Sequence, residues 1–548
     1  MEYMNRYADI VARTVKALFA IDVEIKLSRP DPKFGDVATN VAMQLAGRLH
    51  ESPREIAETI ARELRTNDAF LDAVVAGPGF INITLGATSL LDMTRQESPL
   101  FRAGQTIVIE TNNPNPFKAM HIGHAFNAIL GDTIANLLAV SGGQVYRVSY
   151  HGDVGLHVGK SMYALLRYAD GDFTKIESIP KIDRNTFMSK MYAEGSKAYK
   201  EDETAQSEIN DLAEQSFEPT SGLYIQIYDL CKAWSFEQID HLVARLGNQP
   251  TVYRFLESDA DHRGVEVVKR NVPKVFQESS GALIFEGSKY GAFDNVFVAS
   301  NGRGLYAARD LGLMLLKNEQ FHPDKSYIVT AEEQRDYFKG VIAAAGLVWP
   351  DRKDVTVNIS TGTVKLTTGK MSSRDGDVIE IAWLFDQFTA AIAERGGEPT
   401  DEIIAGALRY QFLKVKIGGD VVFDVDEAVS LTGNTGSYLQ YAHARARRIL
   451  EKSGASFVMP ITLRDEDYAL VRKLGEYAEI VELATRQLEP HHICNYLFEL
   501  AQEFNRYYEK NQVIGSEYEQ HRLGLVGLYA DILQAGLAIL GIHAPSRM

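Results

Sequence analysis

Three successive patterns of apolar and polar positions lie between residues 105 and 150. "QTIVIET" (105–111) is a short β-branched apolar run ending in an acid, which predicts a buried strand. In "AFNAILGDTIANLLAVSGG" (125–143) apolar residues recur at helical spacing, which predicts a helix that ends at the two glycines. "QVYRVSY" (144–150) predicts a second strand. A strand, a helix and a strand so close together indicate a βαβ unit and therefore a parallel sheet.

The rest of the chain divides by the same patterns. Helical periodicity at 4–20 and 52–66, followed by "VVAGPGFINITL", a strand broken by Gly-Pro-Gly, predicts a compact α/β unit. Residues 165–270 are charged, lack clear strands and predict helices, as an insertion into the sheet domain would. From about 401 the pattern is helical. Strand signals between these two helical regions lie in "GALIFE", "NVFVAS", "KSYIVT" and "VTVNIST".

The predicted fold class is therefore α/β, in three parts. A small α/β domain comes first, a Rossmann-type parallel-sheet domain interrupted by a helical insertion comes second, and an all-α domain comes last. The predicted bounds are 1–100 for the N-terminal domain, 101–164 and 271–400 for the two halves of the sheet domain, 165–270 for the insertion and 401–548 for the helical domain.

Composition agrees with this division. A chain of 548 residues is too long for one core and suggests roughly three to four domains. Hydrophobic residues make up 45% and charged residues 24%, as in ordinary globular proteins. No apolar run approaches the roughly 20 residues that span a bilayer, and the first residues lack the features of a signal peptide. We therefore expect no membrane association.

Cysteine usage and charge narrow the picture further. Cys231 and Cys494 are far apart, which argues against a disulfide framework or a cysteine-rich zinc site and fits a reducing, cytoplasmic location. The net charge is 57 − 73 = −16, so any binding of nucleic acid needs a local basic patch. The segment "AHARARRILEK" (442–452) is one candidate, and the alternative is a solvated helix face.

"NPNPFKAMHIGH" (113–124) is the first candidate site. His121 and His124 come at the start of the predicted helix, where ligands of parallel sheets bind and where free N–H groups attract anions. Gly123 leaves room for a flat group such as a nucleobase, and Lys118 adds a cation. A capped helix with half-buried histidines is the alternative. A zinc site is a weaker one, because no third ligand is close.

"TTGKMSSRDGD" (367–377) is the second candidate site. Lys370, Ser372, Ser373 and Arg374 place two cations and two hydroxyls in a glycine-flanked loop, which suits closure over phosphates. Alone, the segment could equally be a polar turn. "HIGH" and "KMSS" in this order, however, resemble the two signatures of the class I aminoacyl-tRNA synthetases, in which both segments bind ATP and stabilise the pentavalent α-phosphate.

The resemblance implies roles for individual residues. The residues that would stabilise phosphate charge during catalysis are Lys118, His121, His124 and Lys370. The ATP-binding residues would be these four together with Gly123, Met371, Ser372 and Ser373. ATP carrying Mg²⁺ is the implied co-substrate, with no metal ligand from the protein and no zinc. The chain departs from the family pattern in reading "KMSSR" rather than "KMSKS".

Further segments resemble the arginyl-tRNA synthetases in particular. They are "FGDVATNVAMQLA", "GPGFINITL", "SYHGDVGLHVGK", "SYLQYAHARARRIL", "LAQEFNRYY" and "GLAILGIHAPSRM". In that family the N-terminal domain docks against the tRNA elbow and the C-terminal helices bind the anticodon. The implied tRNA contacts are Asn40, Phe80, Tyr441, Arg445 and Arg448.

Arginine as substrate can be compared with the residues. A guanidinium is best held by carboxylate and carbonyl oxygens. Tyr306 and Asp310 are four apart and would share one helix face, although such a pair is often only an ordinary surface feature. The resemblance assigns the arginine side chain to Asp310 and Tyr306, a neutral contact to Gln334, and the amino-acid end to Glu110 and Asn115.

The implied reaction has two steps. Arginine and ATP form arginyl-adenylate and pyrophosphate, and the 2′-hydroxyl of the terminal adenosine of tRNA(Arg) then takes the arginyl group. The expected partners are L-arginine and tRNA(Arg), and the expected state is a monomer. The alternatives are another nucleotidyltransferase with "HIGH", a synthetase for another amino acid, or a non-catalytic tRNA-binding descendant. The family-specific ends of the chain argue against the first two. Retention of the phosphate-contacting residues argues against the third.

Overall fold

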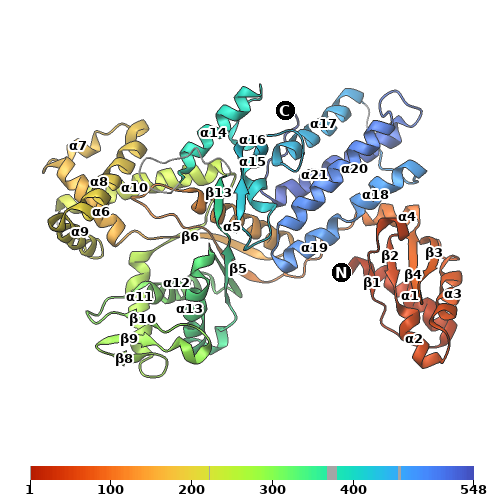
Figure 1. Cartoon of the computed structure of the whole chain (residues 1–548), viewed down its shortest axis with the longest axis horizontal. Coiled ribbons are helices and arrows are strands. Elements are labelled where there is room, and N and C mark those ends of the chain that lie inside the picture. The colour runs from red at the N-terminus through yellow and green to blue at the C-terminus, as the bar shows by residue number, and fades with distance from the viewer. Residues whose placement is uncertain (1, 221, 367–378, 455–457) are drawn as a thin grey trace. The chain divides into compact units, whose positions relative to one another are not determined.

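Figure 1 shows the structure, a computed structural model that describes residues 2–220, 222–366, 379–454 and 458–548. The chain forms two compact units. One unit contains Met1–Phe101, Leu439–Ala538 and Ala544–Met548, and the other contains Arg102–Tyr438 and Ile539–His543.

A five-stranded sheet forms the centre of the second unit, with the strand order β12-β11-β5-β6-β7. All neighbouring strands are parallel, as the βαβ pattern predicts. The strands are β5 (Thr106–Asn112), β6 (Gln144–His151), β7 (Tyr253–Leu256), β11 (Lys325–Ala331) and β12 (Thr356–Thr361). Residues 107–109 of β5 are fully buried, because helices cover both faces of a parallel sheet.

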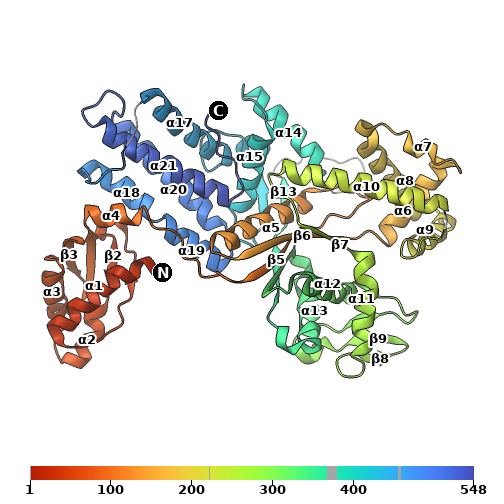
Figure 2. The ribbon, with the colours of Figure 1, turned by 180° about the vertical axis from the view of Figure 1, so that it is seen from behind.

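Helices pack on the two faces of this sheet. The helix α5 (Ile122–Val140) lies along β5 and β6, as Figure 2 shows. Its Gly131 comes so close to β5 that a Cβ atom would lie 3.0 Å from the carbonyl oxygen of Glu110. On the other face, Val108 packs in a cluster with Leu313 of α12 (Tyr306–Phe321). The remaining helices that flank the site are α11 (Glu257–Arg270) and α13 (Arg335–Val348).

The region between β6 and β7 is mostly helical, as its composition predicts. Its helices are α6 (Leu156–Ala169), α7 (Thr174–Glu177), α8 (Arg184–Glu201), α9 (Glu203–Gln215) and α10 (Gly222–Arg245). The sequence indicates no clear strand in 165–270, yet β7 lies there and pairs with β6. This strand has only four residues and one buried side chain, Phe255, so its pattern carries little signal.

Two of the predicted strand signals lie outside the parallel sheet. "GALIFE" and "NVFVAS" correspond to β9 (Ala282–Phe285) and β10 (Asn295–Val298), which form a separate antiparallel sheet with β8 (Gln277–Ser279). A further pair, β13 (Val364–Leu366) and β14 (Val421–Phe423), precedes and follows α14 (Ile381–Glu394) and α15 (Asp401–Leu413). The short helix α16 (Val425–Ala428) follows β14.

A buried arginine binds several segments of the second unit together. Arg409 of α15 is 0% exposed, and all five of its N–H groups have acceptors. Nη2 lies 2.8 Å from Asp132 Oδ2 and 3.1 Å from Thr133 Oγ1, both on α5. Nη1 donates to Leu246 O at 3.0 Å and to Asn248 Oδ1 at 2.8 Å. Nε donates to the carbonyl oxygen of residue 540 at 2.7 Å.

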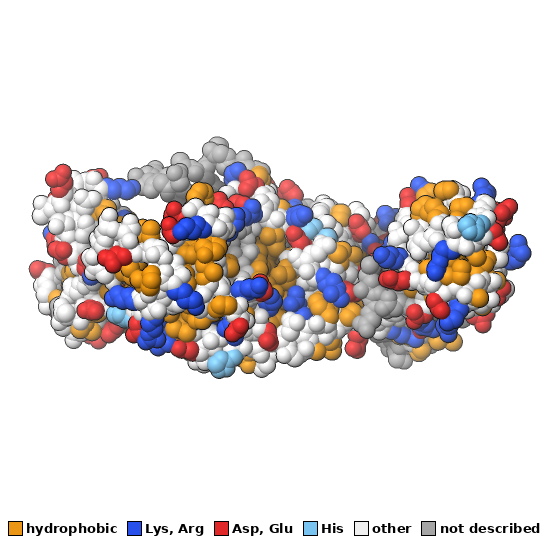
Figure 3. All heavy atoms as spheres, turned by 90° about the horizontal axis from the view of Figure 1, so that it is seen from below, with side chains coloured by type: hydrophobic (Ala, Val, Ile, Leu, Met, Phe, Trp, Pro, Cys, Tyr) orange, Lys and Arg blue, Asp and Glu red, His pale blue; other side chains and the backbone are white. Residues whose placement is uncertain are grey.

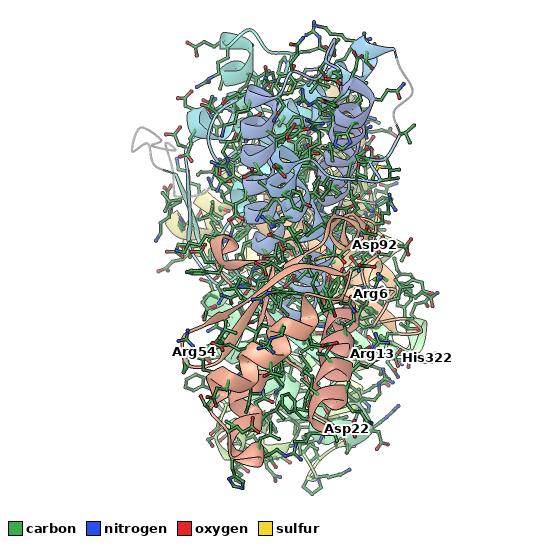
Figure 4. The ribbon with its side chains drawn as sticks, turned by 90° about the vertical axis from the view of Figure 1, so that its right-hand side faces the viewer. Arg6, Arg13, Asp22, Arg54, Asp92 and His322 are labelled. Atoms are coloured by element: carbon green, nitrogen blue, oxygen red, sulfur yellow. The ribbon has the colours of Figure 1, made fainter. Side chains whose placement is uncertain are left out.

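The N-terminal part of the first unit is an antiparallel sheet with helices. The strand order is β1-β2-β4-β3, and the predicted broken strand is a hairpin. The elements are α1 (Glu2–Phe19), β1 (Leu27–Ser28), β2 (Val37–Thr39), α2 (Val41–Leu49), α3 (Pro53–Leu64), β3 (Phe70–Ala76), β4 (Phe80–Leu85) and α4 (Ala87–Met93). Arg6 of α1 and Asp92 of α4 form an ion pair of 3.1 Å, and both are labelled in Figure 4.

Helices of 8 to 21 residues form the other part of this unit. They are α17 (Gly436–Ser453), α18 (Tyr468–Gly475), α19 (Tyr477–Gln487), α20 (His491–Lys510) and α21 (Glu519–Ile539). Among the described residues, α21 is a helix long and apolar enough to cross a membrane, but 78% of that window is buried inside the protein. Burial of this kind is typical of a core helix.

Candidate functional site

The crevice at the carboxyl end of β5 is the expected place for a ligand. From β5 the chain continues to β6 and β7 on one side, whereas β11 and β12 lie on the other side. In open parallel sheets, ligands bind at such a switch point. "NPNPFKAMHIGH" leaves β5 here, and Glu332–Gln334 follows β11 at the same edge. The strand order therefore brings the predicted residues Asn115 and Gln334 to one edge of the sheet.

Contacts of the buried residue Phe117 fix the turn between β5 and α5. Phe117 has a positive φ of 64°, which is unusual for a bulky residue, and its side chain is fully buried. Its N–H donates to Ser235 Oγ at 3.0 Å, and its carbonyl accepts from Ser161 Oγ at 3.0 Å. The ring stacks on Tyr228 with a centroid distance of 5.5 Å. The next residue, Lys118, is exposed, so its ammonium group is available to a ligand.

His121 and His124 cap the first turn of α5 reciprocally. The N–H of His121 donates to Nδ1 of His124 at 3.2 Å, and the N–H of His124 donates to Nδ1 of His121 at 3.4 Å. The rings stack with a centroid distance of 3.5 Å. A side chain at Gly123 would meet the His121 ring at 3.1 Å, which explains the glycine. Because each Nδ1 accepts a hydrogen bond, a neutral ring carries its proton on Nε2 and can donate it.

Both rings are neutral near pH 7. Burial lowers the pKa of His121 from 6.5 to about 4, with a smaller contribution from Lys118. Burial also lowers the pKa of His124 to about 3, followed by the charges of His121, Lys118 and His151. The pair therefore presents two Nε2–H donors rather than two cations.

Acid should destabilise the protein through these histidines. Burial lowers the pKa of His151 to about 3 and that of His157 to about 4 as well. Below pH 6.5 the unfolded chain takes up protons that the folded protein takes up only near pH 4 or below, so the free energy of unfolding should fall across this window. Urea denaturation at pH 7, 6 and 5 measures the effect. The variant His157→Gln should show a shallower pH dependence, and an equal dependence would contradict this assignment.

The end of the second motif's loop pairs with the first motif. Lys370, Met371, Ser372 and Ser373 lie outside the described residues. The segment that follows them is described: Ile379 O accepts from the N–H of Ile122 at 2.9 Å, and the N–H of Ile381 donates to Met120 O at 3.1 Å. Glu380 and His121 thus form an antiparallel bridge. Backbone hydrogen bonds therefore link the first motif to the segment that follows the second motif in the sequence.

Acidic side chains gather on the other side of the crevice. Asp310 is half-buried and accepts a hydrogen bond from the hydroxyl of Tyr337. Burial raises the pKa of Asp310 to about 7; the Tyr337 hydrogen bond opposes this, and the charge of Glu110 adds to it. Glu110 is buried and forms an ion pair with Lys317. Its second oxygen accepts from Asn113 Nδ2 at 2.5 Å.

Two further groups complete this side. Glu257 accepts from Arg309 Nη1 at 2.6 Å, and Arg309 Nε lies 2.9 Å from Asp261. Asn115 Oδ1 accepts from the N–H of Gly152 at 3.1 Å. Thus β5, α11 and α12 supply four carboxylates, of which all but that of Asp310 pair with Arg309 or Lys317. An excess of carboxylates suits a cationic ligand.

Tyr306 and Asp310, which the sequence predicts on one helix face, both lie on α12. Tyr306 begins α12, is 71% exposed and lies beside the Arg309 guanidinium, 5.3 Å from ring centroid to Cζ. The phenol that binds Asp310 is that of Tyr337, on α13. Gln334 is exposed at the end of a short 3₁₀ helix.

The predicted tRNA contacts lie at the surface of the first unit. Asn40 precedes α2 and accepts from Gln44 at 2.8 Å, and Phe80 is 43% exposed at the start of β4. On α17, Tyr441, Arg445 and Arg448 line an open hollow of about 460 Å³. Its other lining residues are Ala444, Glu451, Lys452, Ser546, Arg547 and Met548.

The face of the molecule in Figure 3 carries both signs of charge. On the face in Figure 3, Lys and Arg side chains are intermixed with Asp and Glu. The net charge of −16 therefore does not make this face uniformly acidic. Among the residues that the structure describes, no group of three His, Cys, Asp or Glu side chains is placed to hold a metal ion.

Sequence reasoning missed several residues of the site. Tyr337 and Lys317 each bind a predicted arginine ligand, and Glu257 lies beside Asn115 across Gly152. A signal existed for Lys317 alone: it is a lysine within the apolar run "LGLMLLK", seven residues after Asp310 and so on the same helix face.

Comparisons with known proteins cover the whole chain. The family model for the catalytic domain of class I tRNA synthetases (R) matches residues 87–403. The model for the arginyl tRNA synthetase N terminal domain matches 5–85, and that for the DALR anticodon binding domain matches 439–548.

Similar proteins have the same extent. The arginine–tRNA ligase of Synechococcus elongatus is 29% identical over 587 residues, which cover 99% of this chain and 98% of the relative. That of Limosilactobacillus fermentum is 29% identical over 585 residues and is covered completely, as is this chain. The arginyl-tRNA synthetase structure from Thermus thermophilus matches with a TM-score of 0.79 and 24% identity, covering 99% of this chain and 100% of that one. The one from Plasmodium falciparum matches with a TM-score of 0.77 and 18% identity, covering 100% and 99%.

The parallel sheet, its switch-point crevice and the paired motifs define a class I aminoacyl-tRNA synthetase. The catalytic-domain model alone matches more than half of the residues. The chain belongs to the arginyl-tRNA synthetase family.

Proposed function

We propose that this protein attaches L-arginine to tRNA(Arg) at the expense of ATP. The observation that carries the proposal is the backbone pairing of residues 120–122, at the N-terminus of α5, with residues 379–381, which follow the "KMSS" segment in the sequence. The acidic crevice beside it supplies partners for a guanidinium. Family membership supports the same function for both features, because the similar proteins are arginine–tRNA ligases.

In the first step, the arginine carboxylate attacks the α-phosphorus of ATP and pyrophosphate leaves. The Nε2–H groups of His121 and His124, aimed from the helix N-terminus, donate to the phosphate oxygens, and Lys118 and Lys370 add positive charge. Gly123 leaves the backbone open to the adenosine, with Met371, Ser372 and Ser373 closing over the phosphates. Mg²⁺ enters with ATP, since the proposed site supplies no metal ligand.

Arginine lies across the crevice between β5 and α12. Asp310 receives the guanidinium, and Tyr306 closes over it from the start of α12. Glu110 and Asn115 hold the amino-acid end, with Gln334 as a neutral contact. The Asp310 carboxylate favours arginine over amino acids with neutral side chains, because a neutral side chain would leave the desolvated carboxylate unpaired.

In the second step, the 2′-hydroxyl of the terminal adenosine of tRNA attacks the arginyl carbonyl, and AMP leaves. Residues 1–100, through Asn40 and Phe80, contact the tRNA elbow. The helical domain contacts the anticodon through Tyr441, Arg445 and Arg448, where the hollow of α17 collects positive charge. Residues 165–270 are the connective insertion between the two halves of the catalytic domain, 101–164 and 271–400. We infer a cytoplasmic monomer.

The test is arginine attachment to tRNA with ATP, together with thermal shift against twenty amino acids. Arginine should be the one amino acid that raises the melting temperature and is esterified to tRNA. Stabilisation by another amino acid, or by none in the presence of ATP and tRNA, would refute the proposal. The tRNA must be present throughout, because the first step in this family generally requires it.

The affinity for arginine should depend on pH through Asp310. A guanidinium needs an ionised carboxylate, and the pKa of Asp310 is raised to about 7. Arginine should therefore bind about tenfold more weakly at pH 6 than at pH 8, as follows from a single titration near 7. Isothermal titration measures this, and Asp310→Asn should bind weakly with no pH dependence. A flat profile in the unmodified protein would exclude Asp310 as the titrating group.

A further inference from the structure

Lys317 is a buried lysine to which neither the family resemblance nor the proposed mechanism gives a role. It is 1% exposed, and its ammonium group contacts Glu110, whose side chain is also 1% exposed. Burying two charges costs several kcal/mol per ion before their attraction is counted, so such a pair is a poor device for stability alone. Its ion pair with Glu110, a residue proposed to bind the substrate, suggests a functional reason for it.

Lys317 and Asp310 lie on one side of α12. They are seven residues apart, which is nearly two turns, so their side chains point in almost the same direction. Glu110, at the end of β5, faces the same side, because it binds Lys317. Two carboxylates and one ammonium group therefore lie on this side of α12.

The groups that act on Asp310 come from every element around it. They are Glu110 of β5, Tyr150 of β6, Glu257 of α11, Lys317 of α12 and Tyr337 of α13. Glu110 and Glu257 raise the pKa of Asp310, whereas the Tyr337 hydrogen bond and Lys317 lower it. Arg309 is already bound to Glu257 and Asp261. Lys317 is thus the cation that offsets the repulsion from Glu110.

We propose that Lys317 is a positioning residue for arginine: by binding Glu110 it fixes that carboxylate and offsets its charge, which leaves Asp310 as the carboxylate that receives the guanidinium. This inference rests on the proposed arginine substrate. Asp310 has no ion-pair partner among the described residues, and its only bound neighbour there is the Tyr337 hydroxyl. A guanidinium entering the crevice therefore meets one unpaired carboxylate and one that is already paired.

Lys317→Met tests the proposal by removing the charge while nearly preserving the shape. Without the ammonium group, the repulsion from Glu110 keeps Asp310 protonated to higher pH. The midpoint of the pH dependence of arginine binding should then move up by about one unit, so that arginine binds about fivefold more weakly at pH 7 and regains its affinity near pH 9. KM for arginine should rise, whereas kcat at saturating arginine and KM for ATP should change little.

Two variants make the result specific. Lys317→Arg keeps the charge and should keep the wild-type pH profile. Lys325→Met is the control. Lys325, the first residue of β11, binds the carbonyl of Asp354, and this exchange should leave the pH profile of arginine binding unchanged. Should Lys317→Met not fold, Lys317→Gln removes the charge and should give the same shift.

The outcomes separate this inference from the function beneath it. A lysine with only a structural role predicts a lower melting temperature and arginine binding reduced equally at every pH, which would overturn the proposal. An unchanged profile in Lys317→Met would overturn it too. If the unmodified protein binds no arginine at any pH, the proposed function itself fails, and this inference fails with it.

Discussion

Replacing His124 by alanine should lower kcat for arginine attachment by roughly 30- to 900-fold. The Nε2–H of His124 is a fixed donor at a helix N-terminus, and loss of one such preorganised donor costs about 2–4 kcal/mol of transition-state stabilisation. The ring is neutral at pH 7 because burial lowers its pKa to about 3, so the loss should be that of a hydrogen bond rather than of a charge. Single-turnover charging of tRNA measures the chemical step directly.

A matched exchange separates this effect from a general one. His322, labelled in Figure 4, is an exposed histidine at the end of α12 with a positive φ of 47°, a conformation that asparagine tolerates. His322→Asn should charge tRNA at the wild-type rate. Since His124 also caps α5, the melting temperature of His124→Ala should be recorded alongside. Wild-type charging by a folded His124→Ala protein would disprove its proposed role.

Replacing Arg409 by methionine should reduce the free energy of unfolding by about 3–5 kcal/mol. The substitution leaves the buried carboxylate of Asp132 with fewer partners and removes donors from several carbonyl and hydroxyl oxygens at once. Asp132 keeps a second arginine, Arg147, at 3.1 Å, which limits the loss. Urea denaturation followed by tryptophan fluorescence and circular dichroism measures the change.

The control is an arginine in an exposed pair. Arg395 lies 2.9 Å from Asp426, and the two side chains are 42% and 75% exposed. Arg395→Met should cost no more than about 1 kcal/mol, because water screens and replaces such pairs. Equal stability of the Arg409→Met and Arg395→Met proteins would mean that the buried network contributes specificity rather than stability.

Local pattern predicted the parts of the fold whose signal is local. The elements β5, α5 and β6 follow directly from the periodicity of residues 105–150, because one face or both faces of each are buried continuously. The strand β7 was not predicted. It has four residues with one buried side chain, and it is a strand because it pairs with β6, about a hundred residues earlier in the sequence. The antiparallel pairing of β9 and β10 was not predicted for the same reason, because the strand with which a strand pairs depends on tertiary context.

For the candidate site, too, the sequence predicted the local features and not the contacts between distant segments. The motif containing His121 and His124 was found from spacing, and the structure adds what spacing cannot supply, namely the reciprocal caps that set the tautomer. The helical repeat predicts that Tyr306 and Asp310 share one face. The structure adds that the helix begins at Tyr306, whose ring is exposed, and that the hydrogen bond to Asp310 comes from Tyr337 on another helix. A contact between α12 and α13 has no sequence signature.

The carbonyl oxygen at residue 540 has a consequence for the order in which the protein is made. It accepts from Arg409 Nε, while Asn136 Nδ2 donates to the carbonyl oxygen of residue 539 at 3.0 Å. The sheet unit is therefore discontinuous in the sequence. When residues 102–438 have been synthesised, the Arg409 guanidinium still lacks one of its acceptors. Some hundred further residues of the helical domain must be translated before the carbonyl oxygen of residue 540 is present. The catalytic part of this protein is begun early in synthesis and completed only when residues 539–543 have been translated.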